Sequence, residues 1–297
     1  MPSSARMLLV SNRLPVRVRV DHGRLDLEPT VGGLATGLAG PHRDRGGVWI
    51  GWPGDVARLD AAQREELDGR LALARLAAVH LTATEVQRFY EGYSNGVLWP
   101  LFHSMPDRMP SESRDWDVYA QVNERFADAV AAAWRPGDVV WVHDYQLLLL
   151  PQLLRARIPS ARIGLFLHIP FPPSEVLRIL PRRAELLRGM LGADLLGFQT
   201  FIDQHNFFAS ILRLLGYEPD LDRVAVGGRD VRVRVCPIGV DYEAFSAPTG
   251  DVTLTNDLAR SRKPREALLL GVDRLDYTKG IPRRLLAFER LLERHPR

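Results

Sequence analysis

The chain has 297 residues, 46% of them hydrophobic, and can bury a substantial core as one large domain or two modest ones. Its 39 Lys and Arg against 36 Asp and Glu leave a net charge of +3, too small and too spread for a nucleic-acid-binding protein. The single cysteine, Cys236, excludes an internal disulfide, and no run approaches the roughly 20 apolar residues of a membrane span. We therefore expect a cytoplasmic protein that does not associate with membranes.

The first part of the chain predicts short strands, a hairpin and a glycine-led helix. An apolar strand covers residues 7–11, and alternating apolar and polar residues over 16–20 and 24–27 indicate a hairpin. Gly32 and Gly33 stand directly before a helix-like run, where bare backbone N–H groups can approach an anion. A second strand over 48–52 and a helix from about 60 to 73 follow.

The middle of the chain alternates helices and strands. Apolar residues at three- and four-residue steps predict an amphipathic helix over 116–134. After this helix we expect strand 139–142, helix 146–157, strand 163–167, a helix from Ser174, strand 194–198, helix 201–215 and a hairpin-like pair over 224–235. Short strands alternating with helices are typical of a parallel α/β sheet.

The last part predicts the opening of a second domain. Residues 248–264 are polar and turn-rich, so we place a domain boundary between 240 and 265, giving domains 1–245 and 246–297. An apolar run over 267–272 reads as a buried strand that leads into a charged loop and a helix over 281–292. Arg274, Lys279 and the start of that helix together suit a diphosphate. We expect the rest of this site to lie outside the sequence.

Several polar residues directly follow predicted strands, where ligands of parallel sheets collect. These residues are Arg13, Asp144, His168 and Arg274. Each also has a structural alternative: a surface salt bridge for Arg13, the N-cap of a helix for Asp144, and a packed histidine bonded to a backbone carbonyl for His168. The aromatic residues Trp52, Tyr90, Tyr93 and Trp99 suit either the core or the apolar face of a sugar.

Other chemistries find little support in the residues. The Asp-x-Asp pairs at 115–117 and 220–222 precede a helix and flank a turn, and we interpret both as chance. The sequence has no Gly-x-Ser-x-Gly, Walker loop, His-Glu-x-x-His or strand-linked Gly-x-Gly-x-x-Gly motif. We accordingly predict no metal and no cofactor.

Seven motifs in order carry a resemblance to a known family. They are Ser11-Asn-Arg13, Gly32-Gly33-Leu, Trp49-Ile-Gly-Trp52, Tyr93-Ser-Asn-Gly-Val-Leu-Trp99-Pro-Leu-Phe-His103, Trp141-Val-His-Asp144-Tyr, Phe166-Leu-His168-Ile-Pro-Phe-Pro and Arg274-Leu-Asp-Tyr-Thr-Lys279-Gly280. Together they resemble the trehalose-6-phosphate synthase family over nearly the whole chain. The resemblance implies a GT-B fold of two facing Rossmann-like domains, here an N-terminal domain and the opening strand, loop and helix of an incomplete second one.

The resemblance also implies a reaction and residue roles. Members of the family transfer glucose from UDP-glucose to glucose 6-phosphate, with retention and without a metal, so that trehalose 6-phosphate forms. By resemblance the catalytic residues are Asp144, His168, Arg274 and Lys279. The acceptor-binding residues are Arg13, Trp52, Tyr90, Trp99 and Asp144. The donor-binding residues are Gly32, Gly33, His168, Arg274 and Lys279.

Some alternatives stay open at the level of the sequence. A related transferase with another acceptor, such as a glucosylglycerol-phosphate synthase, would carry a similar scaffold, and so would a non-catalytic sugar-phosphate-binding module. The sequence does not fix the donor nucleotide, and it allows but does not require a homo-oligomer. We expect residues 1–297 alone to have little or no transferase activity.

Overall fold

A computed structural model of the chain describes residues 5–21, 24–30, 32–54, 56, 59–112, 114–240, 242–246 and 269–295. The chain divides into two compact units, Met1–Ile238 and Gly239–Arg297, and each is described by itself. The division precedes the range 240–265 in which the sequence predicts a domain boundary. The domain bounds 1–245 and 246–297 stay a prediction.

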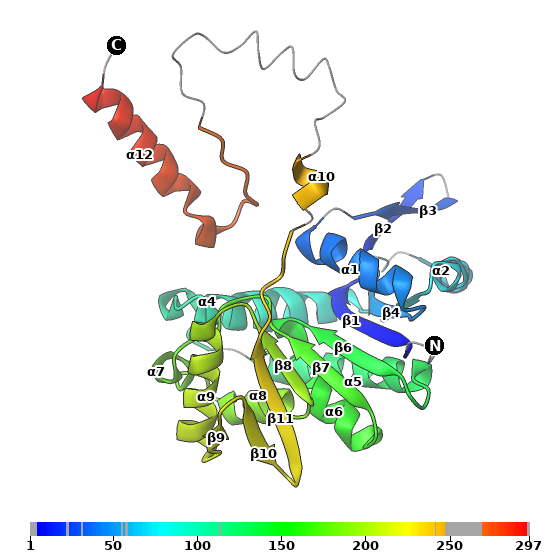
Figure 1. The fold of residues 1–297 in the computed structure, drawn as a ribbon. Helices are drawn as coiled ribbons and strands as arrows, with labels where there is room; N and C mark the ends of the chain where they lie inside the picture. The colour runs from blue at the N-terminus through cyan, green and yellow to red at the C-terminus, as the bar shows by residue number, and fades with distance from the viewer. Residues whose placement is uncertain are drawn as a thin grey trace. The chain divides into compact units, whose positions relative to one another are not determined.

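The first unit is built on one large sheet (Figure 1). Its strand order in the described residues is β5-β4-β1-β6-β7-β8-β11-β10-β9. Neighbours from β5 to β11 run parallel, while β10 and β9 are antiparallel additions at one edge. A separate hairpin pairs β2 with β3. This architecture confirms the predicted α/β class and the Rossmann-like N-terminal domain.

The strands are β1 Met7–Arg13, β2 Val16–Asp21, β3 Arg24–Pro29, β4 Trp49–Trp52, β5 Leu76–Ala78, β6 Val139–His143, β7 Arg162–Phe166, β8 Leu195–Phe198, β9 Pro219–Asp220, β10 Arg223–Val226 and β11 Arg229–Val235. The helices of the first unit are α1 Gly33–Asp44, α2 Ala61–Leu73, α3 Ala83–Glu85, the π-helix η1 Val86–Leu98, α4 Trp99–Phe102, the 3-10 turn η2 Pro106–Arg108, α5 Trp116–Ala133, the 3-10 turn η3 Tyr145–Leu147, α6 Leu150–Arg157, α7 Ser174–Leu177, α8 Arg183–Met190 and α9 Phe201–Leu215. The second unit has α10 Tyr242–Ser246, the 3-10 turn η4 Tyr277–Lys279 and α12 Ile281–Arg294.

Strand β1 shows how the sheet separates two hydrophobic clusters. Successive side chains of a strand point to opposite faces, and Leu8 and Val10 join the large cluster that also includes Phe126 of α5. Leu9, between them, joins a smaller cluster with Leu38 of α1. Figure 1 shows α5 and α6 behind the sheet. Burial on both faces explains why β1 reads as an uninterrupted apolar run.

Four elements differ from the sequence predictions. The run predicted as a buried strand over 267–272 has no strand in its described part, and Leu270 and Val272 are more than 80% exposed. A strand needs a paired neighbour, and the described residues of the second unit supply none. The helix expected from 146 begins at Leu150, after a 3-10 turn. Strand β5 and the π-helix η1 were not predicted, and the predicted linker over 248–264 lies outside the described residues.

Candidate active site

Arg13 and Trp52 meet at the carboxyl ends of two adjacent parallel strands. Arg13 ends β1, Trp52 ends β4, and the strand register pairs them directly. The Arg13 guanidinium carbon lies 4.5 Å from the centroid of the Trp52 ring, a cation–π contact. Arg13 makes no ion pair with any residue that the structure describes. Among these residues, the surface salt bridge considered as an alternative for Arg13 is therefore wrong. The exposed guanidinium is a cation held against a flat aromatic surface.

Tyr90 adds a second ring to this cluster. It projects from η1, and its ring centroid lies 6.1 Å from that of Trp52. Trp52 is only 4% exposed, and its indole Nε1 has no hydrogen-bond partner in the described structure, whereas Tyr90 is half-buried. Trp52 is therefore a core residue with one face at the site, and Tyr90 is open enough to contact a ligand.

The π-helix that carries Tyr90 is tied to α5 by charged groups. Arg88 donates to Asp115 at 2.8 Å and to Asp117 at 3.0 Å. Gly92 lies so close to the Asp115 carboxylate that a Cβ at this position would stand 2.2 Å from Oδ2. The Asp-x-Asp pair that the sequence left without a role thus fastens η1. Such π-helical segments are rare and occur often at functional sites.

Asp144 follows β6 in a strained backbone conformation. Its φ of 76° and ψ of 173° fall in a region that is essentially restricted to glycine. Its N–H donates to the Phe166 carbonyl at 2.8 Å, and its Oδ1 accepts the backbone N–H of His168 at 3.2 Å. Its side chain makes no cap hydrogen bond to the following turn, so the N-cap alternative is wrong. The carboxylate instead joins the ends of β6 and β7.

His143 and His168 form a hydrogen-bonded pair beside Asp144. His143 Nδ1 lies 3.0 Å from His168 Nε2, and the ring centroids are 5.3 Å apart. Burial lowers the pKa of His168 to about 4 and that of His143 well below its ordinary value, so both rings are neutral at pH 7. His168 is a packed histidine, but its partner is a second imidazole and not the backbone carbonyl that the sequence alternative assumed.

Tyr145 anchors the turn that carries Asp144. Its hydroxyl donates to Asn95 Oδ1 of η1 at 2.8 Å, and its carbonyl accepts from the hydroxyl of the fully buried Tyr119 at 2.8 Å. The Tyr145 ring also lies 5.6 Å from that of Trp99, which is half-buried. The turn after β6, η1 and α5 are therefore joined around the predicted acceptor residues.

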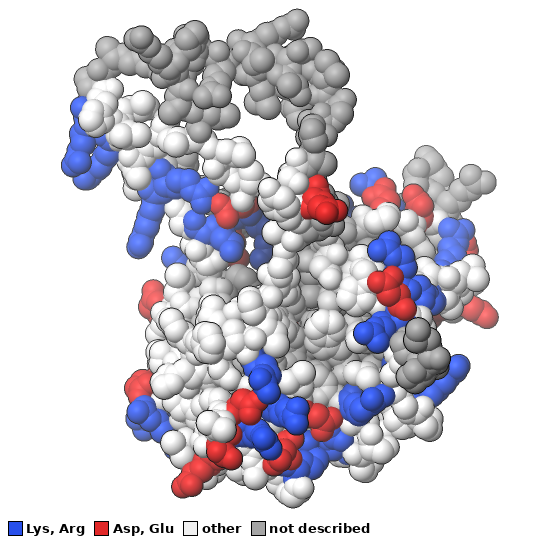
Figure 2. All heavy atoms as spheres, in the orientation of Figure 1, with Lys and Arg blue, Asp and Glu red and all other residues white. Residues whose placement is uncertain are grey.

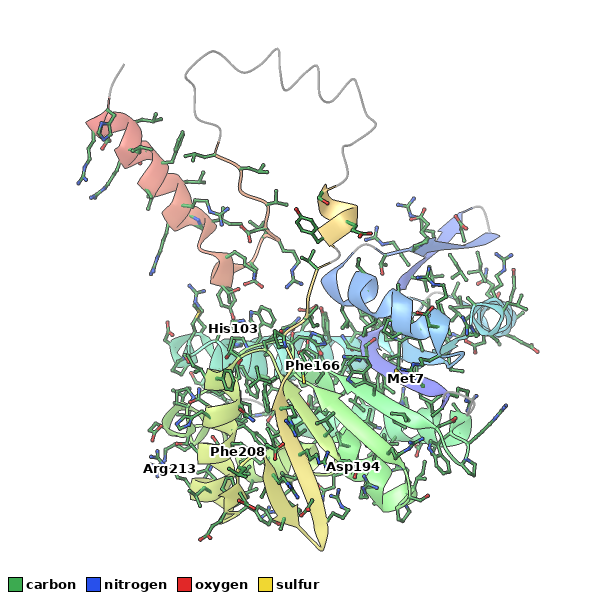
Figure 3. The ribbon with its side chains drawn as sticks, in the orientation of Figure 1. Met7, His103, Phe166, Asp194, Phe208 and Arg213 are labelled. Carbon is green, nitrogen blue, oxygen red and sulfur yellow. The ribbon has the colours of Figure 1, made fainter. Side chains whose placement is uncertain are left out.

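A cavity of about 670 Å³ opens on one face of the sheet. Gly33, His143 and His168 line it, and Trp141 and Gly164 form part of its floor. Figure 3 labels three further lining residues, Met7, Phe166 and Asp194, on the face of the sheet seen by the viewer. Most of the lining is apolar. Figure 2 shows that charged residues gather on the surface at the lower end of this unit. The histidine pair and Gly33 thus supply polar groups to a mainly apolar cavity.

Gly32 and Gly33 begin α1 with an open helix terminus. Gly32 is the N-cap, no side chain caps the helix, and both glycines are exposed. A Cβ built on either residue would meet nothing within 4 Å. The first N–H groups of a helix have no partner within it and attract anions. An anion can therefore approach this end of α1 closely, and the donor-binding role of both glycines stays a prediction.

Comparisons with known proteins identify the family. A model described as glycosyltransferase family 20 matches residues 5–297. The chain belongs to glycosyltransferase family 20. It is 42% identical to a bifunctional trehalose-6-phosphate synthase/phosphatase of Thermoproteus tenax, over 98% of the chain and 41% of that protein. The chain thus spans less than half the length of this relative.

Two solved structures show the same fold. One is the N-terminal domain of a Candida albicans trehalose-6-phosphate phosphatase, with a TM-score of 0.83 and 34% identity over 99% of this chain and 62% of that one. The other is a UDP-forming alpha,alpha-trehalose-phosphate synthase of Burkholderia xenovorans in complex with glucose 6-phosphate. Its TM-score is 0.78, with 34% identity over 98% of this chain and 63% of that one.

In this family 20 chain, Arg274 and Lys279 belong to the second unit. Both are exposed; Arg274 precedes the turn η4, and Lys279 is the last residue of that turn, directly before Gly280 and α12. Asp276 fixes the turn by accepting the N–H of Thr278 at 2.8 Å, and Gly280 takes a φ of 62° where α12 starts. Two cations therefore lie in the short stretch of sequence that leads into α12. Their assignment to a diphosphate stays a prediction.

The family 20 site includes residues that were not predicted as functional. His143 contacts the predicted site residue His168, and Tyr145 contacts Trp99. Asn95 accepts a hydrogen bond from the hydroxyl of Tyr145, and all three residues lie inside motifs that the sequence singled out. Their positions one residue from Asp144 and four from Trp99 were the available signal. In the described ranges no three His, Cys, Asp or Glu side chains gather closely enough for a metal ion. No described helix has both the length and the apolar character needed to cross a membrane.

Proposed function

We propose that this family 20 chain carries the acceptor site and part of the donor site of an enzyme that transfers glucose from UDP-glucose to glucose 6-phosphate. The product would be trehalose 6-phosphate, formed with retention of the donor's anomeric configuration. The observation that carries the proposal is the Arg13 guanidinium over Trp52, next to Tyr90. An arginine fork suits a phosphate, and the half-buried ring of Tyr90 suits the C–H surface of a sugar.

The names of the similar proteins support this substrate pair. One is a UDP-forming synthase that holds glucose 6-phosphate, and it matches 98% of this chain. The chain of that synthase is longer than the present one, so we propose the same activity and substrates only for the complete enzyme of which this chain would form part. A cytoplasmic location belongs to it as well, and a lone cysteine, Cys236, is compatible with that compartment.

The proposed chemistry depends mainly on charge stabilisation. UDP gains negative charge as glucose leaves, and we assign Arg274, Lys279 and the backbone N–H groups at Gly32 and Gly33 to that charge. We assign no protein nucleophile, because the leaving phosphate can itself take the proton of the acceptor hydroxyl. No metal is invoked in this scheme.

On the acceptor side, Asp144 accepts a backbone N–H from His168 and so couples the predicted acceptor-binding strand end to the predicted donor-binding one. Trp99 packs on Tyr145, directly after Asp144. We propose that this connection places the acceptor hydroxyl against the donor sugar. Positioning of this kind lowers a barrier without any covalent step.

Binding and product analysis test the proposal together. Glucose 6-phosphate is expected to raise the thermal unfolding midpoint of the chain, because a ligand that binds the folded state stabilises it. With UDP-glucose and glucose 6-phosphate present, trehalose 6-phosphate is the expected product of the complete enzyme. Glycerol 3-phosphate as acceptor tests the glucosylglycerol-phosphate alternative. Stabilisation by glucose 6-phosphate without any product, even in the complete enzyme, would indicate a binding module, and no stabilisation by this ligand would refute the acceptor site.

A further inference from the structure

The contact between His143 and His168 joins two neighbouring strands at the site. His143 is the last residue of β6, and its register partner on β7 is Phe166, two residues before His168. The nitrogen atoms Nδ1 of His143 and Nε2 of His168 are 3.0 Å apart. The backbone N–H of His168 is held separately by the Asp144 carboxylate. The ring and the main chain of His168 are thus fixed by two consecutive residues of β6 and its turn.

The direction of the hydrogen bond follows from the burial of His143. Its side chain is 1% exposed, and its other nitrogen, Nε2, is buried without a partner in the described structure. If His168 donated the bond, the neutral His143 would carry its proton on Nε2, leaving a buried N–H unsatisfied. If His143 donates from Nδ1, its Nε2 carries no proton, and the only unsatisfied group is an acceptor lone pair. Unsatisfied buried N–H groups are rarer than unsatisfied acceptors, so His143 is the donor.

This direction fixes the tautomer of His168. Its Nε2 then accepts, and a neutral imidazole with one accepting nitrogen carries its proton on the other. The proton of His168 is therefore on Nδ1. A ring in this state has an N–H to offer a ligand, while its lone pair is already used by His143.

We propose that His143 is a positioning residue that holds His168 in the Nδ1–H tautomer, so that His168 acts as a hydrogen-bond donor to an oxygen of the bound sugar nucleotide. The ligand atom it meets is then a hydroxyl or phosphate oxygen. The same geometry argues against a general-base role for His168, because its accepting nitrogen is occupied. The identity of the ligand rests on the proposed function, whereas the tautomer does not.

Histidine-selective ¹⁵N labelling of the chain and long-range ¹H–¹⁵N NMR at pH 7 test the tautomer directly. His168→Asn assigns the signals of His168, and His205→Asn, which removes an exposed histidine of α9, is the matched control. We expect His168 to show a protonated Nδ1 and an unprotonated Nε2. Replacing His143 with Leu should release both tautomers, whereas His143→Asn, which keeps an N–H near Nδ1, should retain the original one.

Activity supplies an independent readout in the complete enzyme. We expect His143→Leu to lower kcat about tenfold with little change in the KM for glucose 6-phosphate, and His143→Asn to restore most of the rate. An Nε2–H tautomer in the unsubstituted chain would overturn the inference, and so would a His168 tautomer that His143→Leu leaves unchanged. If His143→Leu does not fold, the spectra of the unsubstituted chain and of His143→Asn still decide. The expected spectra in a protein without transferase activity would refute only the proposed function.

Discussion

Arg13 and Trp52 are the end residues of two paired parallel strands, and the Arg13 guanidinium carbon lies 4.5 Å from the centroid of the Trp52 ring. Because both side chains are positioned by strand ends, their contact needs little loop structure. The rigid sheet therefore presents a cation on an aromatic surface in the free protein. We expect this pair to dominate the recognition of a phosphorylated sugar.

Replacing Arg13 with Lys should weaken glucose 6-phosphate binding about tenfold, because an ammonium cannot form the two-pronged bond of a guanidinium or stack as well on Trp52. Calorimetric titration measures the change. Arg17→Lys on the exposed side of β2 is the matched control and should bind normally. Equal affinities for the Arg13→Lys and unsubstituted chains would remove Arg13 from the acceptor site.

The stability of the first unit should fall between pH 7 and about pH 4. The pKa of His168 is about 4 in the folded chain and 6.5 when unperturbed, so the unfolded state binds the proton more tightly. Below pH 6.5 protonation therefore favours unfolding. The stability is complete above pH 6.5 and is lost progressively toward pH 4, by roughly 3 kcal/mol from His168 alone. The lowered pKa of His143 acts in the same direction.

Urea unfolding at several pH values checks this prediction. In His168→Asn, the loss between pH 6.5 and 4 should be clearly smaller than in the unsubstituted chain. An identical pH dependence in the two proteins would mean that His168 titrates normally in the folded state.

Tyr119→Phe should destabilise the first unit by about 1–3 kcal/mol. The Tyr119 hydroxyl donates to the Tyr145 carbonyl and accepts the N–H of Leu148 at 3.2 Å, all in a fully buried setting. Removing it takes one buried hydrogen bond from each of these two main-chain groups. Tyr217→Phe, at a half-buried tyrosine, is the control and should change stability by less than about 0.5 kcal/mol. Equal unfolding midpoints for both variants would contradict the role of this hydroxyl.

Asp203→Ala should lower the free energy of unfolding by about 2–3 kcal/mol, more than the loss of an ordinary helix cap does. Asp203 completes a capping box with Thr200 and also accepts the N–H of Phe171 at 2.8 Å, while being only 5% exposed. Asp60→Ala removes the exposed capping box of α2 and should cost about 1 kcal/mol. Denaturant titration of both variants tests this order, which the reverse ranking would disprove.

Much of the sheet could be predicted because burial leaves a simple pattern. Strand β1 is buried on both faces, β6 is buried on one face and partly buried on the face toward the cavity, and both appear as short apolar runs. Helix α5 shows a clear helical period. Strand β5 has only three residues, too few for any period to appear. The π-helix η1 depends on the Arg88 and Asp115 contact and on Gly92, which no local pattern reveals. The run over 267–272 shows the opposite error, because apolar residues predict burial only where a partner surface exists.

The site was predictable where topology alone places a residue. Arg13 ends a strand, Asp144 and His168 follow strands, and the structure brings the last two into contact. The aromatic residue Trp52 could be suggested by chemistry, but its contact with Arg13 depends on the register of β1 and β4. His143 was missed because a buried residue at the end of a strand resembles any core position. Its partner becomes visible only when β6 and β7 are paired.

Asp144 has the backbone angles of a glycine and the side chain of an acid. A glycine at this position would relieve strain of about 1–3 kcal/mol, so Asp144→Gly is expected to make the first unit harder to unfold. The same change would free the main chain of His168 from its carboxylate anchor. Folding and function thus favour different residues at position 144, and a search for thermostable variants of this chain would select against the very corner where the substrates are proposed to meet.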